Sequence, residues 1–527
     1  MFRRFALIAF IAAAANFLLA TAMGGYDLRF GPVHLVATYI YKPLLYVNAA
    51  FLLVLIANAK RGALARAENA GEKFHAGMRF WAVASGLLFL LYGCSFAINS
   101  NFPDWTHRAL TTGVPPWIFF VHRQYDGFYR PLVFVSLWAD NQIFGPALWG
   151  YHIQNLILQL LNAYLVAHLA FRLGLNTNLA RWCGIVFLVV PASFEAVIWP
   201  GARFDLMAAA FTLIALDRAL SGSLWLSTAA YCLGVLSKES AYAYPLLLAA
   251  LMLFAGVLGI RLERKRWLQI LAAAAVATVG MLLIRVGIYG NLGGYPSQQN
   301  GTGPAVNFVL RWKTLTDFPV HLPATLLLIN TGAGLSWWLR ITLFAYIALL
   351  AVLAFGGASA GKRTVLLAIA IPAAAPTANM LGWMTPFAQQ GRYLYQPLIW
   401  VAMVAACAIW CMHIAPRYRQ LLLCGWTAVM ATAALFNTSV YLREMRTIRA
   451  ATTEAEAACR DAGCRRLVLE NLPRDYEGTF YFGWQVRYNV TRDLPGVALA
   501  TDDDPVPRAG RTVALRWTDE NRWRLIQ

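Results

Sequence analysis

The fold of this chain is decided by residues 267–288, WLQILAAAAVATVGMLLIRVGI, a stretch that is apolar almost throughout. A helix needs about 20 such residues to cross the roughly 30 Å hydrocarbon core of a bilayer. The stretch comes directly after four basic residues, Arg261, Arg264, Lys265 and Arg266. Because basic loops stay on the cytoplasmic side of a membrane, the stretch predicts a transmembrane helix that runs outward from the cytoplasm.

The whole chain has the composition of a membrane protein. Of its 527 residues, 59% are hydrophobic and 13% are charged. Ordinary soluble domains carry roughly 25% charged residues, so this chain has too little polar side chain to cover a soluble globule of its size. The composition therefore argues against a soluble protein with several buried domains.

The net charge of +19 would at first suggest a nucleic-acid partner, but its distribution argues otherwise. Basic clusters recur in alternate loops between the apolar runs, at residues 3–4, 60–79, 172–181, 261–266, 362–363 and 417–419. This is the pattern of loops that face the cytoplasm. The charge thus indicates orientation and attraction to anionic lipid head groups, and no nucleic-acid partner is predicted.

Applied along the chain, the same rule predicts an all-α polytopic membrane protein with about 13 transmembrane helices. The predicted spans run alternately outward and inward over residues 4–22, 34–58, 80–98, 148–171, 182–199, 205–219, 222–237, 242–259, 267–288, 338–356, 364–383, 393–413 and 420–440. The first could instead be a cleaved signal peptide, with Ala20-Thr21-Ala22 as the cleavage site. The later topology is the same in either case.

The spans divide the chain into three parts. Residues 1–78 form two additional N-terminal helices with a basic cytoplasmic loop, and 79–440 form a membrane core with outer loops at 99–147 and 289–337. Residues 441–527 turn polar and predict a small extracytoplasmic α+β domain, with a helix over 443–462 and strands near 465–472, 479–490, 511–517 and 522–527.

Two cysteines of this last domain, Cys459 and Cys464, flank a short turn, whereas the other six lie in predicted spans. A disulfide between them is plausible in an oxidising compartment. The alternative is a metal site, but no second pair of Cys or His residues accompanies them.

Ionisable residues inside or at the edge of spans cost roughly 2.5–3.5 kcal/mol each on insertion scales and usually mark a cavity or a site. Because the predicted spans run alternately outward and inward, all the candidates fall on the outer surface. They are Asp104, Asp126, Arg130, His152, Asn155, Glu195, Arg203, Asp205, Lys238, Glu239, Arg392, Tyr393 and Tyr395. Carboxylates beside several cations, half sunk in lipid, suit an anionic lipid-linked substrate.

Several short segments carry these residues in a recognisable order: Tyr129-Arg130-Pro131-Leu132, Gly150 to Asn155, Leu160 to Ala163, Pro191 to Trp199, Arg203-Phe204-Asp205, Leu236 to Glu239 and Gly391 to Tyr395. Together they resemble the GT-C superfamily of membrane glycosyltransferases, which use polyprenyl-phosphate sugars. The resemblance is greatest to the membrane core of the transmembrane and tetratricopeptide-repeat O-mannosyltransferases and their bacterial relatives. It covers residues 99–400.

The resemblance implies an inverting sugar transfer at the outer membrane surface. An acidic residue of the first outer loop would take the proton from the acceptor hydroxyl, and Asp104 occupies that place. The relatives often have two acids there, so either Asp126 is the partner or the pair is lost and activity with it. Arg130, Lys238 and Arg392 would hold the donor phosphate.

The resemblance also gives Tyr393 and Tyr395 a role, because they could pack on the prenyl chain or bond to the phosphate. It leaves the acceptor open, because the relatives' tetratricopeptide repeats have no counterpart here. The acceptor could be a protein, a lipid or a polysaccharide.

Structural interpretations of the same residues remain open beside these roles. Asp104 could cap a helix, and Asp126 before a glycine could be a turn residue. Glu195 and Arg203 could form a structural ion pair that closes a helical hairpin. His152 could be a hydrogen-bonded core residue, and Lys238 could lie at a helix end.

Two other functions also remain open, namely a non-catalytic GT-C-like subunit and a lipid or solute transporter. A transporter would more often show an internal repeat of its two halves, and the sequence has none. Nothing in it has the spacing of a zinc, P-loop or dinucleotide motif, so no cofactor is certain and a divalent cation stays open. The expected location is the inner (plasma) membrane of a bacterium, with membrane lipid and a polyprenyl-phosphate-linked sugar as partners.

Overall fold

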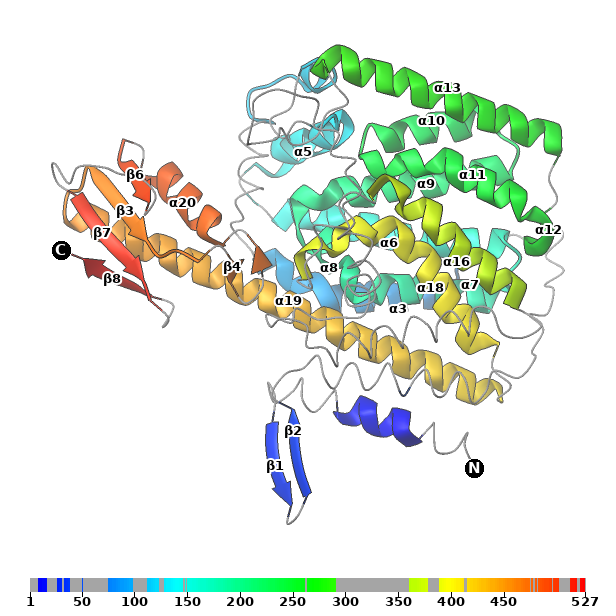
Figure 1. Ribbon diagram of the computed structural model, residues 1–527, viewed down its shortest axis with the longest axis horizontal. Helices are drawn as coiled ribbons and strands as arrows, with labels where there is room; N and C mark the ends of the chain where they lie inside the picture. Colours follow the sequence, from blue (N-terminus) through cyan, green and yellow to red (C-terminus); the bar gives the residue numbers. More distant parts are fainter. Residues whose placement is uncertain are drawn as a thin grey trace, which may run out of the picture.

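The computed structural model is a bundle of helices from which one long helix projects, carrying a small mixed domain at its far end (Figure 1). It describes residues 8–16, 26–30, 33–37, 50, 74–97, 111–122, 128–145, 147, 149–260, 263–290, 360–377, 388–411, 415–473, 475–476, 479–480, 482–494, 496–501, 512–518 and 522–526. Within these residues, five helices are long and apolar enough to cross a membrane, or six if a bent pair counts as one span. The chain is therefore a helical membrane protein, and the full set of 13 predicted spans remains a prediction.

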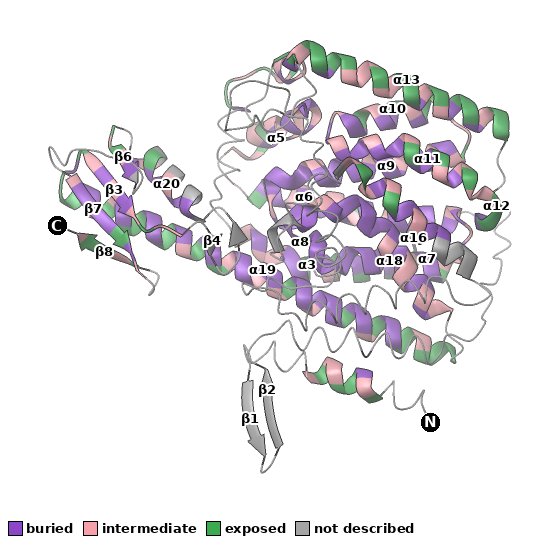
Figure 2. Ribbon diagram, viewed as in Figure 1, coloured by how far each residue is buried: buried purple, intermediate pink, exposed green. Residues whose placement is uncertain are grey.

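The centre of the bundle is built from helices that follow one another closely in the sequence and are joined by short turns. They are α6 (Trp149–Arg172), α7 (Thr177–Val189), α9 (Arg203–Leu220), α10 (Leu224–Val235), α11 (Tyr244–Leu253) and α12 (Ala255–Leu258), with α18 (Tyr395–Trp410) and α16 (Ala360–Ala374) added from later in the chain. Buried residues fill the interior of this group (Figure 2).

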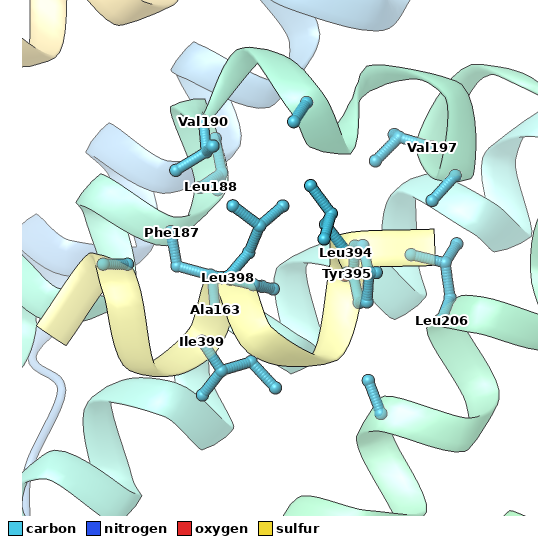
Figure 3. Close-up of a cluster of buried hydrophobic side chains, with 14 of the residues drawn as sticks. Ala163, Phe187, Leu188, Val190, Val197, Leu206, Leu394, Tyr395, Leu398 and Ile399 are labelled. Carbon is cyan, nitrogen blue, oxygen red and sulfur yellow. The ribbon is translucent and has the colours of Figure 1, made fainter. Parts of the chain in front are cut away.

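Small and large residues alternate where these helices meet. A Cβ atom on Gly184 of α7 would lie 2.4 Å from the carbonyl oxygen of Ala163 on α6, so only glycine permits this approach. Around this contact, Leu188, Leu398 and Ile399 interdigitate, as Figure 3 shows. Such close packing makes the helices of the bundle a rigid support for any site at their ends.

The predicted span at 182–199 is not one straight helix. Helix α7 ends at Val189, and α8 (Phe194–Ile198) follows the 3-10 turn η3 (Pro191–Ser193), with the two parts bent by 55°. Pro191 has no N–H to continue the helical ladder, and its ring restricts the residue before it, so the break falls there. The bend turns the short helix α8 across the end of the bundle.

The outer loop predicted at 99–147 contains a helix that the sequence analysis missed. Helix α5 (Pro131–Phe144) begins with proline at its first position, where the missing N–H costs nothing, and it follows the 3-10 turn η2 (Pro116–Phe120). The backbone N–H of Leu132 donates to the carbonyl of Leu236 at 3.2 Å. This bond ties the start of α5 to the end of α10.

Other predicted spans correspond to helices with shifted ends. The span at 80–98 is α3 (Met78–Tyr92) with the 3-10 turn η1 (Gly93–Ala97), and the opening stretch is α13 (Arg264–Tyr289), which lies at one edge of the bundle (Figure 1). Val276 and Val279 of α13 are exposed, as expected of a helix that faces lipid.

The N-terminal region departs from the prediction. The second span was predicted over 34–58, but residues 34–37 belong to a strand, β2 (Val33–Ala37), which pairs antiparallel with β1 (Tyr26–Phe30). The sequence around Gly31-Pro32 has the turn signal and the β-branched residues of a hairpin. A helix over 8–16 lies inside the first predicted span, and the span at 338–356 lies outside the described residues.

The predicted domain boundary at 440–441 falls inside a continuous helix. Helix α19 (Pro416–Asp461) joins the predicted span 420–440 to the predicted helix 443–462, and at 46 residues it is about 69 Å long. That exceeds the roughly 30 Å of a bilayer core by more than a factor of two. The helix therefore carries the far part of the tail, including its four-stranded sheet, well away from the rest of the bundle (Figure 1).

The C-terminal tail contains a small sheet, and its strands differ from those predicted. Its sheet has the order β6-β3-β7-β8 and consists of β3 (Arg466–Glu470), β6 (Ala498–Thr501), β7 (Thr512–Trp517) and β8 (Trp523–Ile526). Strand β3 runs parallel to both β6 and β7, and β8 is antiparallel to β7.

The strand predicted near 479–490 is mostly wrong. Only β5 (Thr479–Phe480) is extended, paired with β4 (Asp475–Tyr476), and helix α20 (Phe482–Asp493) follows. A connection between the parallel strands β3 and β6 must cross over the sheet, and α20 is that crossover. Cys459 and Cys464 form a disulfide at the end of α19, so the predicted pairing is confirmed.

Candidate functional site

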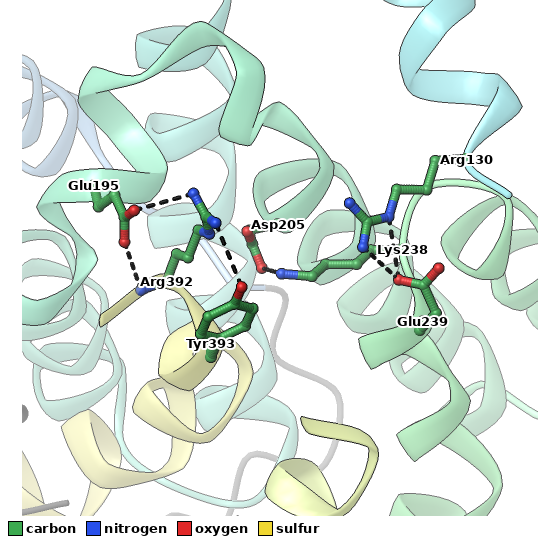
Figure 4. A network of polar contacts seen from close by, with 7 residues as sticks. All are labelled: Arg130, Glu195, Asp205, Lys238, Glu239, Arg392 and Tyr393. Carbon is green, nitrogen blue, oxygen red and sulfur yellow. Dashed lines mark hydrogen bonds and ion pairs between the residues drawn. The ribbon is translucent and has the colours of Figure 1, made fainter. Parts of the chain in front are cut away.

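A row of charged side chains crosses one end of the helical bundle, and all are buried except the half-buried Glu239; Figure 4 draws every member but Arg285. We call it the ion-pair row, and it consists of Glu195, Arg392, Asp205, Lys238, Arg130, Glu239 and Arg285. Its members come from six different parts of the chain, all brought to one place by the helix ends. Burying so many charged groups costs free energy unless each has a partner of opposite charge, so the fold must bring these residues together in pairs.

The first pair joins α8 to the turn before α18. Arg392 lies in η7 (Ala388–Leu394), and its Nη1 donates to Glu195 Oε1 at 3.0 Å. Both side chains are 7% exposed. The guanidinium carbon of Arg392 also lies 4.5 Å from the ring centroid of Trp199 and 5.2 Å from that of Tyr393. Arginine thus has a carboxylate on one side and aromatic faces on the other.

The second pair lies in the middle of the row. Lys238 lies between α10 and the 3-10 turn η5 (Glu239–Ala243), and its Nζ donates to Oδ1 of Asp205, in the first turn of α9. Nζ is also 4.8 Å from the ring centroid of Phe204 and 5.1 Å from that of Tyr393. The ring of Tyr393 therefore lies close to the cations of both Lys238 and Arg392.

Burial is the main reason that the pKa of Lys238 falls to about 8. The charge of Asp205 acts against this fall, and the nearby cations of Arg130 and Arg392 add to it. An ammonium group with this pKa loses its charge within the physiological range, unlike an ordinary lysine.

The third group contains two arginines and one carboxylate. Arg130, directly before α5, donates through Nε and Nη2 to Glu239 Oε2 at 3.1 and 2.8 Å. Arg285 of α13 approaches the other carboxylate oxygen of Glu239 at 3.2 Å. The Arg130 guanidinium carbon lies 4.5 Å from the ring centroid of Phe204. The row as a whole thus has four cations, three carboxylates and a formal excess of one positive charge.

Local structure explains why the acids occupy these places. Glu195, Asp205 and Glu239 each lie in the first turn of a helical segment. Negative side chains are favourable there, because the free N–H groups of a first turn carry partial positive charge. The bases come from the connecting segments, except for Arg285.

Arg203 belongs to a different network, so the predicted Glu195–Arg203 ion pair is wrong. Arg203 is fully buried and pairs with Asp140 of α5. It also donates to Asn155 Oδ1 at 2.9 Å, to Ser136 Oγ at 2.7 Å and to the carbonyl of Tyr151 at 2.9 Å. This side chain holds α5, α6 and α9 together.

Three further candidates are placed in the interior of the bundle. The Nδ2 of Asn155 donates to the carbonyls of Val197 and Trp199 at 3.3 and 3.0 Å, which fixes α8 against α6. His152 is buried on α6. The Tyr395 hydroxyl donates to Gln159 and accepts from Asn162, with its ring edge-on to Phe187.

Of the two tyrosines that were expected to meet the donor, the structure therefore brings only Tyr393 to the ion-pair row. Tyr395 points instead into the packed helices, as Figure 3 shows. Asp104 and Asp126, the candidates for the base, lie outside the described residues.

Arg285 and Asp140 were missed in the sequence. Arg285 had a usable signal, because it is the charged residue inside an otherwise apolar span, and such residues face the protein interior. Asp140 gave no comparable signal, because its segment was read as a loop. Among the described residues, no group of three or more His, Cys, Asp or Glu could hold a metal ion.

Comparison with known proteins adds little to this geometry. No protein-family model matches the chain, and no curated protein matches it. Among solved structures, the chain is similar to the crystal structure of ArnT from Cupriavidus metallidurans bound to undecaprenyl phosphate, with a TM-score of 0.41 and 13% identity. The similarity covers 84% of this chain and 93% of that one. At that identity and TM-score it supports no conclusion about function.

Proposed function

We propose that this chain is an integral membrane glycosyltransferase that transfers a sugar from a polyprenyl-phosphate donor to an acceptor on the extracytoplasmic side, with inversion. The observation that carries the proposal is the ion-pair row: four cations and three carboxylates, all buried except the half-buried Glu239, gathered at one end of a bundle of apolar helices. A structural need alone is usually met by single pairs, whereas clustered charges at a membrane protein's helix ends are typical of a site.

The charge of the row suits a lipid-linked sugar phosphate. Such a donor is a phosphodiester with one negative charge, which matches the formal excess of one positive charge. When the bond to the sugar breaks, the phosphate keeps the electron pair and gains a second negative charge. The cations of Arg392 and Lys238, both close to the Tyr393 ring, would stabilise this growing charge in a site that excludes water.

The base remains a proposal from the sequence. Asp104, with Asp126 as its partner, would accept the proton of the acceptor hydroxyl while the oxygen attacks the anomeric carbon from the side opposite the phosphate. That geometry inverts the configuration of the sugar. The extracytoplasmic location follows from the basic loops of the sequence, which assign the ends of α8, α10 and α18 that meet in the row to the outer face.

A transfer assay tests the proposal. Purified protein is incubated with a panel of polyprenyl-phosphate sugars, and wild type is compared with Asp104→Asn and with Asp461→Asn. Asp461 ends α19 and is exposed, so its substitution serves as a matched control. We expect transfer by wild type and by the control and a large loss in Asp104→Asn. Equal transfer by all three would remove Asp104 from the mechanism.

A non-catalytic subunit is the second candidate. It is favoured by the fact that the cations of the row already have carboxylate partners, as a purely structural network would. Binding of a polyprenyl phosphate without transfer from any donor would support this second function. Movement of the donor across liposome membranes would instead support a transporter.

A further inference from the structure

The segment that carries Arg392 is seated directly on the bundle. A Cβ atom on Gly391 would lie 2.4 Å from the carbonyl oxygen of Ala192, so the backbone of η7 touches the backbone of η3. The amide N–H of Arg392 also points to Glu195 Oε2, at 3.5 Å. One side of η7 is therefore fixed by the broken helix of α7 and α8.

The segment η7 also lies close to the tail domain. Cα atoms of β5, in the β4–β5 hairpin of residues 475–480, come within 8 Å of Cα atoms of η7. In Figure 1 the hairpin lies where the tail domain meets the bundle, apart from the four-stranded sheet. The turn that carries Arg392 is thus close both to the η3 turn of the bundle and to a hairpin from about 90 residues further along the chain.

The tail domain is anchored to the same helix that contacts the η3 turn. The indole Nε1 of Trp523 in β8 donates to the carbonyl of Ala451 on α19 at 2.7 Å, and Ile448 and Ala455 are buried on the same helix. Nearer the start of α19, Asn437 donates to the carbonyl of Pro191 at 3.4 Å. One helix therefore contacts both the η3 turn and the tail sheet.

We propose that the tail domain is part of the site, and that its β4–β5 hairpin is a positioning element that holds η7, and with it Arg392, against Glu195. The hairpin forms the second side of a clamp whose first side is the contact between Gly391 and Ala192. Its effect on sugar transfer rests on the proposed function, whereas the clamp itself does not.

The test uses the full chain with a reporter cysteine, Gln390→Cys, whose reaction with a membrane-impermeant maleimide is timed. In this background the hairpin variant Thr479→Gly with Phe480→Gly is compared with Leu525→Ser. Leu525 is an exposed residue of β8 in the same domain. We expect labelling about tenfold faster in the hairpin variant, because η7 opens locally, and no change with Leu525→Ser.

Kinetics of the same variants without the reporter test the consequence for the site. A displaced Arg392 weakens phosphate binding before the reaction starts, so we expect the KM for the donor to rise about tenfold or more with a smaller fall in kcat. The positioning role would be overturned if kcat and the amount of folded protein fell together while the labelling rate stayed unchanged.

A second pair of cysteines keeps the proposal testable if the hairpin variant does not fold. Thr479→Cys with Gln390→Cys should be joined by a short bis-maleimide cross-linker, because Cα atoms of the two segments come within 8 Å of each other, whereas Leu525→Cys with Gln390→Cys should not. Absence of the first cross-link would overturn the proposal. Because labelling and cross-linking need no sugar transfer, failure of the clamp and failure of the proposed enzyme activity can be told apart.

Discussion

Arg392 Nη1 donates to Glu195 Oε1 at 3.0 Å, and the two residues are 197 positions apart in the chain. Their pairing joins the broken helix after α7 to the turn before α18. Both groups are buried, so each depends on the other to remain charged. The same contact can therefore serve the fold and the phosphate site, and the two roles predict different outcomes for single and double substitutions.

Arg392→Gln should destabilise the protein by about 3–5 kcal/mol, because it leaves the Glu195 carboxylate buried without its partner. The double variant Glu195→Gln with Arg392→Gln should recover most of that loss. If Arg392 also holds the donor phosphate, the double variant should still show transfer reduced about 100-fold or more. Thermal unfolding in detergent and the transfer assay, run side by side, measure the two effects.

The surface pair of Arg460 and Glu456 is the control for this experiment. It has the same chemistry at 3.2 Å, but the arginine side chain is 61% exposed. Arg460→Gln should change stability by no more than about 1 kcal/mol. Recovery of transfer in the double variant would show that Arg392 has a structural role alone.

Arg203 should behave differently from Arg392, although both are buried arginines. Arg203→Met leaves Asp140 buried and should cost about 3–5 kcal/mol, whereas Arg203→Met with Asp140→Leu should recover part of the stability. Donor affinity should be retained in the double variant, because Arg203 pairs within the bundle and not in the ion-pair row. Loss of donor binding in a stably folded double variant would contradict that separation.

The sequence was sufficient where one local signal decides the structure. The apolar run of α13 and its basic flank predict that helix without further information, and the Cys459–Cys464 spacing predicts the disulfide. The break before Pro191 also has a local cause. The 55° bend does not, because it depends on what α8 packs against.

Pairing within the site could be predicted only in part. The sequence identified six of the seven members of the ion-pair row, because charged residues at span ends are rare and therefore conspicuous. The sequence could not show that Glu195 pairs with Arg392, which is distant in the chain, and not with Arg203, which is closer in the chain. Arg203 is instead paired by Asp140, which α5 carries, and the segment of α5 was predicted to be a loop.

Donor binding should depend on pH through Lys238. Its pKa of about 8 means that the ammonium is charged below this value and loses its charge as the pH rises through it. Affinity for a polyprenyl phosphate should therefore be constant at lower pH and fall above about pH 8, up to tenfold per pH unit if the charge is essential. Lys238→Arg should remove this fall, because a guanidinium stays charged.

Affinity measured across about two pH units on either side of that pKa is the readout. The groups that face Lys238, namely Asp205, Arg130 and Arg392, remain the same in Lys238→Arg, which makes it a matched control. Identical pH profiles for wild type and Lys238→Arg would show that Lys238 does not contribute its charge to binding.

Loss of the Cys459–Cys464 disulfide should loosen the tail domain and leave the bundle intact. The bond closes a short loop, with a sequence separation of 5, at the end of α19. For so short a loop the chain-entropy estimate is about 2 kcal/mol, a large fraction of the stability of a small domain. Cys459→Ser with Cys464→Ser should therefore speed proteolysis of the tail sheet, while cleavage within the bundle stays unchanged.

Mass spectrometry of the non-reduced wild type also tests the proposed sidedness, because the bond should be complete only in an oxidising compartment. Fully reduced cysteines in freshly isolated membranes would place the tail domain on the cytoplasmic side and, with it, the end of the bundle that holds the ion-pair row.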